Sequence, residues 1–250
     1  MKKIVILVAL GNMLGGSVTF FYFTFFLPST ENNPAIPGYY ETLFFLAAMT
    51  MLSLMSYPLF KRKSVRALYE VANGSKNISG FDTVTIYQLQ KGALQYPMVV
   101  TVISFLVWII AGFIFGFLEP LITSMIFNVV TPDLVLCLRR FLGIILLGGG
   151  VTCLVLFFVL ESAWRPYIPR FFPEGHLNQA KNVFKISVRN RFLVVTLGII
   201  LIPLPVIVAT IIFNIHQLHL ADAVTRSQLI SSLYWELFFI SADSLIIASI

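Results

Sequence analysis

The chain has 250 residues, of which 58% are hydrophobic and only 11% are charged. Soluble globular domains carry about 25% charged residues, so this composition excludes an ordinary water-soluble protein. The apolar residues also form long uninterrupted runs, which excludes a membrane β-barrel, because barrel strands alternate in polarity over about ten residues. The sequence therefore predicts an all-α, polytopic membrane protein.

Six apolar stretches are long enough to cross a bilayer as helices, since twenty residues at 1.5 Å per residue cover its roughly 30 Å hydrocarbon core. The fourth stretch is the clearest, because it contains no charged residue. We expect one transmembrane domain, residues 1–250, built of three helical hairpins joined by connectors 61–97 and 161–191. The predicted spans are 4–27, 41–60, 98–118, 141–160, 192–213 and 228–250.

The placement of Lys and Arg predicts how the chain is oriented. Fourteen of its 17 basic residues lie in the N-terminal segment or in the two connectors. Since basic residues concentrate on the cytoplasmic side, we expect both connectors and both termini to be cytoplasmic, in a multi-pass protein of the inner (plasma) membrane. The net charge of +6 suits the anionic inner leaflet, and no connector has the aromatic pattern of a nucleic-acid partner.

Two G-x-x-x-G patterns lie in the first and third predicted helices, at Gly11/Gly15 and Gly112/Gly116. Small residues at this spacing let two membrane helices approach closely, so they indicate packing positions. In the connector between these helices, the pattern predicts a helix over 65–71, a turn, and a second helix that runs into the membrane.

The segment between the third and fourth helices begins at Glu119-Pro120, which we expect to close the third helix. The segment is mostly apolar and is predicted to lie along the membrane interface. It ends at Arg139 and Arg140. Two roles remain open for these arginines: they bind lipid headgroups, or they pair with Glu119 and Asp133.

The fourth helix is expected to end on a charged foot at the cytoplasmic interface. Glu161 and Arg165 are four residues apart in the order that favours an ion pair on a helix. Trp164 suits an interface, and Pro166 stops the helix. This foot is interpreted mainly as an anchor that fixes the depth of the helix.

The fifth and sixth helices carry the residues that we assign to ligand binding or sensing. Pro203 and Pro205 are expected to kink or locally open the fifth helix. Glu236 and Asp243 are seven apart on the sixth helix and so share a face. Intramembrane carboxylates usually face a bundle interior, where they bind a ligand or cation or sense protonation. The alternative is that Glu236 is hydrated near the interface and Asp243 bonds to a neighbouring Ser or Thr.

His216, His219 and Asp222 are spaced three residues apart just outside the fifth helix. On a helix they would share a face, and this set can bind zinc or copper with a further ligand. The alternatives are surface histidines without a metal, or reporters of external pH. No cofactor is predicted, and the sequence contains no nucleotide-binding, metalloprotease or serine-hydrolase motif.

Four segments have a familiar pattern: ALGNMLGGSVTFFYFTFFLP (9–28), FLVWIIAGFIFG (105–116), LESAWRPYIPRFF (160–172) and RNRFLVVTLGIILIPLP (189–205). Together they resemble the six-helix membrane anchor of bacterial class III adenylate cyclases. The resemblance implies that a HAMP linker and a dimeric cyclase domain follow the sixth helix. Since that helix is still apolar at Ile250, we expect the parent protein to continue. No catalytic residue can be assigned within these 250 residues.

The first functional hypothesis is therefore a membrane anchor and sensory domain of a homodimeric adenylate cyclase. Its partners are the lipid bilayer and a cytoplasmic output domain, and its role is signal transduction leading to cAMP synthesis. The alternative is a small transporter or channel, because proline-broken helices and intramembrane carboxylates build substrate sites. A membrane enzyme acting on lipid ranks last, because the chain has no clustered nucleophile or metal set.

Overall fold

The computed structural model describes residues 2–26, 63–129, 133–173, 201–220 and 223–248, with single positions between them. All regular structure in these ranges is helical, and no strand occurs among them. The predicted second span, 41–60, lies almost entirely outside the described residues. The prediction of an all-helical chain is confirmed for the part that the structure describes.

The chain forms long, nearly continuous helices in which the hydrogen-bond pattern changes locally. Two of these long helices contain π-helical turns (η3 and η4), and the second of them ends in a 3-10 helix, η5. In chain order the elements are α1 (Lys2–Phe26), α3 (Lys63–Ala72), η2 (Ile78–Gly80), α4 (Thr83–Phe113), η3 (Ile114–Leu118), α5 (Glu119–Phe127), α6 (Leu134–Leu142), η4 (Gly143–Gly150), α7 (Val151–Trp164), η5 (Arg165–Phe171), α9 (Pro203–Leu220) and α10 (Ala223–Ala248).

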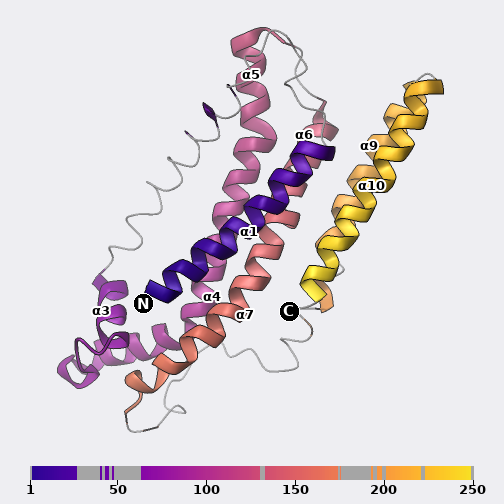
Figure 1. Cartoon of the computed structure of the whole chain (residues 1–250). Helices are drawn as coiled ribbons and strands as arrows, with labels where there is room; N and C mark the ends of the chain where they lie inside the picture. The colour runs from indigo at the N-terminus through magenta and orange to yellow at the C-terminus, as the bar shows by residue number, and fades with distance from the viewer. Residues whose placement is uncertain are drawn as a thin grey trace.

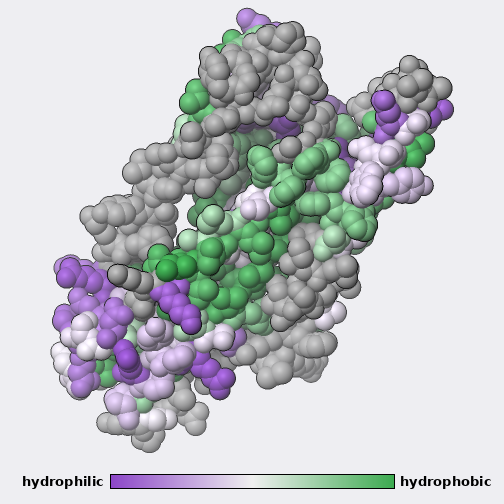
Figure 2. Space-filling view, in the orientation of Figure 1, coloured by the Kyte–Doolittle hydropathy of each residue, from purple (hydrophilic) through white to green (hydrophobic). Residues whose placement is uncertain are grey.

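Apolar helices of membrane-spanning length are present in the described part of the chain. Four are long and apolar enough to cross a bilayer: Lys3–Phe23, Thr83–Phe127, Leu134–Phe171 and Thr196–Ile215. The predicted sixth span is helical, since α10 covers 26 residues, but α10 is not one of these four. These helices suit a lipid bilayer, because their apolar side chains face outward along the bundle (Figure 2).

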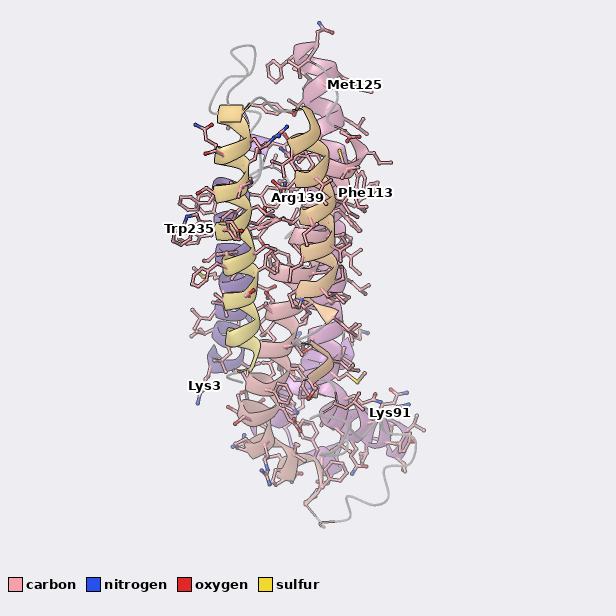
Figure 3. All side chains as sticks on the ribbon, turned by 90° about the vertical axis from the view of Figure 1, so that its right-hand side faces the viewer. Lys3, Lys91, Phe113, Met125, Arg139 and Trp235 are labelled. Atoms are coloured by element: carbon pink, nitrogen blue, oxygen red, sulfur yellow. The ribbon has the colours of Figure 1, made fainter. Side chains whose placement is uncertain are left out.

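The two ends of the bundle differ (Figure 1). Helix α1 begins and α10 ends at the end that carries α3, called here the α3 end. The opposite end, called the α5 end, carries α5 and the start of α6. Hydrophilic side chains gather at the α3 end (Figure 2), where Lys3 and Lys91 lie (Figure 3), whereas Met125 lies at the α5 end.

The connection between the predicted third and fourth helices differs from the expectation. The chain does not leave the helix at Glu119-Pro120: α4, η3 and α5 continue to Phe127, and α6 begins at Leu134. The π-helical turn directly before Pro120 explains this, because a change of hydrogen-bond register lets a helix absorb a proline. Glu119 stays in the helix because it is buried and paired with Arg140.

Both G-x-x-x-G patterns mark close helix contacts, as predicted. A Cβ atom on Gly15 would lie 1.9 Å from the Thr152 hydroxyl and 2.4 Å from the Gly148 carbonyl oxygen, so α1 packs directly on α7 and η4. A Cβ atom on Gly116 would lie 2.9 Å from the Phe141 side chain. Neither pattern needs a functional explanation.

At the α3 end, α3 and the first part of α4 fold over the end of α7. The helices expected in the 61–97 connector are present, and Asp82 caps α4 by accepting a hydrogen bond from the Thr85 amide at 3.1 Å. Pro97 lies within α4, and Figure 1 shows the first part of α4 at an angle to its upright remainder. An apolar core, here the α3-end core, fills this fold; its buried members include Ile4, Leu68, Val71, Leu89, Leu160, Trp164 and Phe171.

Helix α9 begins at Pro203, where a kink was predicted. Pro203 and Pro205 therefore lie in the first turn of α9, where backbone amides have no partner within the helix and a proline costs little. Helices α9 and α10 form an antiparallel pair on one side of the bundle (Figure 1).

Candidate functional site

Two consecutive arginines are buried near the start of the long helix formed by α6, η4 and α7. Arg139 and Arg140 lie in the last turn of α6, and their side chains are 2% and 6% exposed. Consecutive residues of a helix point about 100° apart, so the two guanidinium groups reach different neighbours. Figure 3 shows Arg139 among the helices, whereas Trp235 points outward.

Arg139 joins three other helices. Its Nη2 atom forms an ion pair with Oε2 of Glu236 on α10 and donates a hydrogen bond to the Phe26 carbonyl oxygen at 3.1 Å. Its Nε atom donates to the Tyr22 hydroxyl of α1 at 3.3 Å. The guanidinium carbon lies 4.7 Å from the centre of the Phe213 ring on α9, which adds a cation–π contact.

Both oxygens of the Glu236 carboxylate have protein partners. Oε2 faces Arg139, and Oε1 accepts a hydrogen bond from the Thr210 hydroxyl of α9 at 2.8 Å. Only 1% of the Glu236 side chain is exposed. One turn along α9, the Asn214 side-chain amide donates to the Thr210 carbonyl oxygen at 2.9 Å, so this part of α9 keeps its polar groups internally satisfied.

Arg140 points to α5, on the other side of α6. Its Nη1 atom lies 3.2 Å from Oε2 of Glu119, whose side chain is 8% exposed. The Thr123 hydroxyl lies 3.0 Å from Oε1 of Glu119 and 2.8 Å from the Glu119 carbonyl oxygen. Of the two roles that the sequence left open for Arg140, the structure shows the pairing with Glu119.

These residues form one buried, electrically balanced group, here named the charge cluster. Two guanidinium groups face two carboxylates, so no net charge is taken out of water. A buried ion pair is strongly destabilised when one partner is removed, because the remaining charge stays buried without compensation. The members of the charge cluster are Tyr22, Glu119, Thr123, Arg139, Arg140, Thr210 and Glu236.

The other residues assigned to sensing lie apart from this group or outside the described atoms. Asp243 is in α10, two turns from Glu236, but its side chain is outside the described residues. Pro203 and Pro205 lie in the first turn of α9, one to two turns before Thr210. The structure thus brings Glu236 into the charge cluster and leaves the prolines as the start of α9.

The predicted foot of the fourth helix is at the junction of α7 and η5. Trp164 is fully buried there: its Nε1 atom donates to the Ala93 carbonyl oxygen at 2.7 Å, and its ring stacks on Tyr96 with centroids 4.1 Å apart. Arg165 and Pro166 are exposed, and Glu161 is half-buried. Trp164 therefore belongs to the α3-end core, and the charged residues of the foot surround it.

The possible metal ligands lie outside what the structure describes. His216 and His219 are on α9, but their side chains are not among the described ones, and Asp222 lies between α9 and α10, outside them. Within the described part of the chain, no three His, Cys, Asp or Glu residues come together as a metal site.

Sequence reasoning left open whether Glu236 faces the bundle interior or is hydrated near the interface, and it did not identify the partner of this residue. Arg139 is 97 positions away and was expected either to bind lipid headgroups or to pair with Glu119 and Asp133. One signal was present: two consecutive arginines directly precede a charge-free helix, and opposite charges within apolar helices tend to pair. Nothing in the sequence identified Tyr22 or Thr210.

The charge cluster pairs two buried carboxylates with two buried guanidinium groups. In comparisons with known proteins, no family model, no curated protein and no solved structure matches this chain.

Proposed function

We propose that this chain is a six-span module of the inner (plasma) membrane that senses a stimulus and regulates a cytoplasmic output domain. The distance along the helix between its buried arginines and its charged foot supports a membrane span. From Arg139 to Glu161 the rod of α6, η4 and α7 covers about 30 Å, which equals the hydrocarbon thickness of a bilayer. The charge cluster would then lie near one membrane surface and the foot of α7 near the other.

The distribution of charge supports a cytoplasmic α3 end. Most of the exposed or half-exposed basic residues of the described part gather there. At the α5 end Arg226 is exposed, whereas Arg139 and Arg140 are buried in ion pairs. Such an excess of cations is typical of the cytoplasmic face. At the level of Glu236, Tyr234 and Trp235 are 71% and 65% exposed, which suits an aromatic belt at the opposite surface.

One observation carries the sensory proposal: the carboxylate of Glu236 ties α10 directly to α6 and α9, and through Arg139 also to α1. Helix α10 is the last helix, so in a cyclase of the resembled type it would lead to the output domain. A change in the packing of α1, α6 or α9 would therefore change the position of α10. A stimulus achieves this if it binds two packings of the bundle with different affinity.

The output would be a dimeric domain with cyclase activity, as the resemblance implies, and the module itself would be a homodimer. The charge cluster supports the sensory part of this proposal only. The identity of the output rests on the four resembling segments of the sequence.

The test is a fusion of residues 1–250 to the HAMP linker and catalytic domain of a bacterial adenylate cyclase. One to four alanines are inserted between Ala242 and Asp243, and cAMP synthesis is measured. Each inserted residue rotates the rest of α10 and the output domain by about 100°, so we expect activity to change after one or two insertions and to recover after four. Insertions after the exposed Gly175 serve as the control. Activity that ignores all insertions in α10 would contradict the proposal.

The transporter or channel alternative receives less support from the geometry. A substrate site needs a carboxylate that the substrate can reach, but the Glu236 oxygens are bound to Arg139 and Thr210. This alternative therefore rests on Asp243, whose side chain lies outside the described residues. Flux in proteoliposomes that is lost in Asp243→Asn would support a transporter.

A further inference from the structure

The fully buried side chains in the described stretch of α10 lie within one helical turn, although α10 also packs along α9 and contacts α1 and α7. Side chains of α10 are described from Arg226 to Ala242, and the buried residues in this stretch are Glu236 and Ile240. The residues on either side of this turn are exposed or half-buried, among them Ile230, Tyr234 and Trp235. In the described stretch, α10 is thus seated on the bundle near its middle.

Three contacts make up this seat. Glu236 binds Arg139 and Thr210. The ring of Phe239 lies 5.3 Å from that of Phe26 on α1. Ile240 is fully buried in an apolar group with Tyr22, Leu147 and Val206. The seat therefore combines one directional ion pair with apolar contacts that have no preferred direction.

The ion pair opposes movement of α10 along its own axis. A shift by one turn, about 5.4 Å, would put Ile240 or Ser232 opposite Arg139 in place of Glu236. The guanidinium group would then be buried without a carboxylate, which is among the costliest changes in a protein interior. Ion pairs of this kind are best known for fixing the register of helices.

Arg139 cannot follow α10, because other groups hold it. Tyr22, the Phe26 carbonyl oxygen and the Phe213 ring surround its guanidinium group. The next residue, Arg140, is tied to Glu119 on α5. The socket for Glu236 is thus built from α1, α6 and α9, and the neighbouring pair of Arg140 with Glu119 ties α6 to α5.

We propose that α10 pivots about Glu236 and does not slide. Rotation about this point keeps the carboxylate in its socket while the two ends of the helix move. Glu236 lies near the midpoint of α10, with arms of about 20 Å towards Ala223 and about 18 Å towards Ala248. The ends therefore move by nearly equal distances in opposite directions. This deepens the proposed function, since it specifies how α10 would transmit a signal.

The first experiment measures the register of α10 by thiol cross-linking in proteoliposomes. Phe26→Cys is paired with Phe239→Cys, and separately with Trp235→Cys and Asp243→Cys, which lie one turn to either side. The background carries Cys137→Ala and Cys153→Ala. We expect the pair with Phe239→Cys to dominate by about tenfold or more, since a one-turn shift leaves Arg139 unpaired. Glu236→Leu should spread the cross-links to the neighbouring positions.

Ser241→Ala, an exposed substitution on the same helix, is the matched control and should leave the cross-linking pattern unchanged. If Glu236→Leu leaves the pattern as narrow as in the parent chain, the ion pair does not set the register and the proposal is overturned.

The second experiment separates pivoting from sliding. Spin labels on exposed positions of α10 are measured against exposed positions of α1 by pulsed electron resonance in the same vesicles. The pairs are Trp235→Cys with Phe21→Cys at the pivot, Ser227→Cys with Phe25→Cys at the α5 end, and Ser241→Cys with Lys3→Cys towards the α3 end. A pivot predicts distance distributions that widen with separation from Glu236. Equal widths at all three levels would overturn it.

Neither experiment needs the output domain. If insertions in α10 do not change cAMP synthesis by the fusion but the distance distributions widen away from Glu236, the proposed function fails and the pivot stands. If cyclase activity depends on the insertions but all three distance distributions have equal widths, the pivot fails and the sensory proposal stands.

Discussion

The α5 end and the α3 end of the bundle are held together by different interactions. At the α5 end, the charge cluster joins five helices through two ion pairs and several hydrogen bonds. At the α3 end, an apolar core is built around Trp164. It is edged by hydrogen bonds such as those of Trp164 to the Ala93 carbonyl oxygen and of Arg170 to the Ala72 carbonyl oxygen, and no buried ion pair is found among its described residues. Both regions lie on the same rod, about one bilayer thickness apart.

The difference concerns specificity. Apolar packing at the α3 end tolerates small rotations and shifts, because dispersion contacts and water exclusion have no fixed direction. An ion pair at the α5 end fails as soon as its partners separate, so it defines which residues of which helices must meet. The apolar core at the α3 end therefore holds the helices together, whereas the ion pairs at the α5 end determine which residues of neighbouring helices lie opposite one another.

The largest expected effect is at the α5 end. Glu236→Gln leaves Arg139 buried without a charged partner and should lower the free energy of unfolding by about 3–5 kcal/mol. The double change Arg139→Leu with Glu236→Leu should recover most of this loss, because no charge is then buried. Unfolding is measured in bicelles by titration with a denaturing detergent.

The control for this prediction is Asp133→Asn, which neutralises an exposed carboxylate at the start of α6 and should change stability by less than about 0.5 kcal/mol. Equal effects of Glu236→Gln and Asp133→Asn on the free energy of unfolding would show that the fold does not depend on the ion pair of Glu236 with Arg139.

The next effect tests the α3 end. Trp164→Ala removes a fully buried ring and should cost about 3 kcal/mol of unfolding free energy. Trp164→Phe keeps most of the apolar contact but loses the hydrogen bond to the Ala93 carbonyl oxygen, for a loss of about 1–2 kcal/mol. Trp235→Ala, at an exposed site, is the matched control.

This series distinguishes the two ends directly. If the α3 end depends on packing, Trp164→Phe should be much milder than Trp164→Ala. Two equally severe substitutions would show that the hydrogen bond to Ala93, and so a directional contact, dominates there as well.

A smaller effect is expected between the two ends, where α1 crosses α7. Gly15→Val would place a methyl-bearing carbon within 2 Å of the Thr152 hydroxyl and should cost about 1–3 kcal/mol of unfolding free energy. Gly16→Val is the control, because a Cβ atom on Gly16 meets nothing within 4 Å. The two variants are compared by their thermal unfolding midpoints in detergent. A similar fall of the midpoint in Gly15→Val and Gly16→Val would mean that helix propensity, and not close packing, is responsible.

The smallest effect concerns the surface of the α3 end. Hydrogen bonds from Lys76 and Arg66, 2.9 and 3.0 Å away, lower the pKa of the Glu70 carboxyl below its ordinary value of 4.5. A lowered pKa in the folded state stabilises the fold above pH 4.5, and this contribution is lost as the pH falls through the lowered value. Glu70→Gln should abolish that slight acid sensitivity.

Carbon-13 spectroscopy of the labelled carboxyl group measures this pKa. A midpoint at or above 4.5 in low salt would show that the two surface ion pairs do not persist in solution, as is common for exposed pairs.

The sequence predicted the α3 end better than the α5 end. The two connector helices at the α3 end follow from local signals, namely two helix-like stretches with a turn between them. The structure adds the N-cap at Asp82. The G-x-x-x-G contacts also follow from local spacing. Local sequence patterns are enough to predict a helix when its apolar face can pack against any apolar surface.

The charge cluster could be predicted only in part. Glu119 was expected to close a helix, and Arg139 and Arg140 were expected either to bind lipid headgroups or to pair with Glu119 and Asp133. The pair of Arg140 with Glu119 was among these expectations, whereas the pair of Arg139 with Glu236 was not. Glu119 and Arg139 are buried because each meets a partner from a distant part of the chain. Which carboxylate faces which arginine depends on the packing of whole helices, and spacing along one helix carries no information on it.

The glycine triplet at the end of η4 has a further consequence for how the bundle can change over time. Added methyl groups on Gly148 or Gly149 would strike the Trp108 ring or its Cβ atom, and one on Gly150 would strike Ile202. A single substitution in the triplet therefore displaces a neighbour on another helix. Replacements at these positions are expected to survive only in compensating pairs, in which a smaller residue takes the place of Trp108 or Ile202, so mutational covariation should be strongest along this seam.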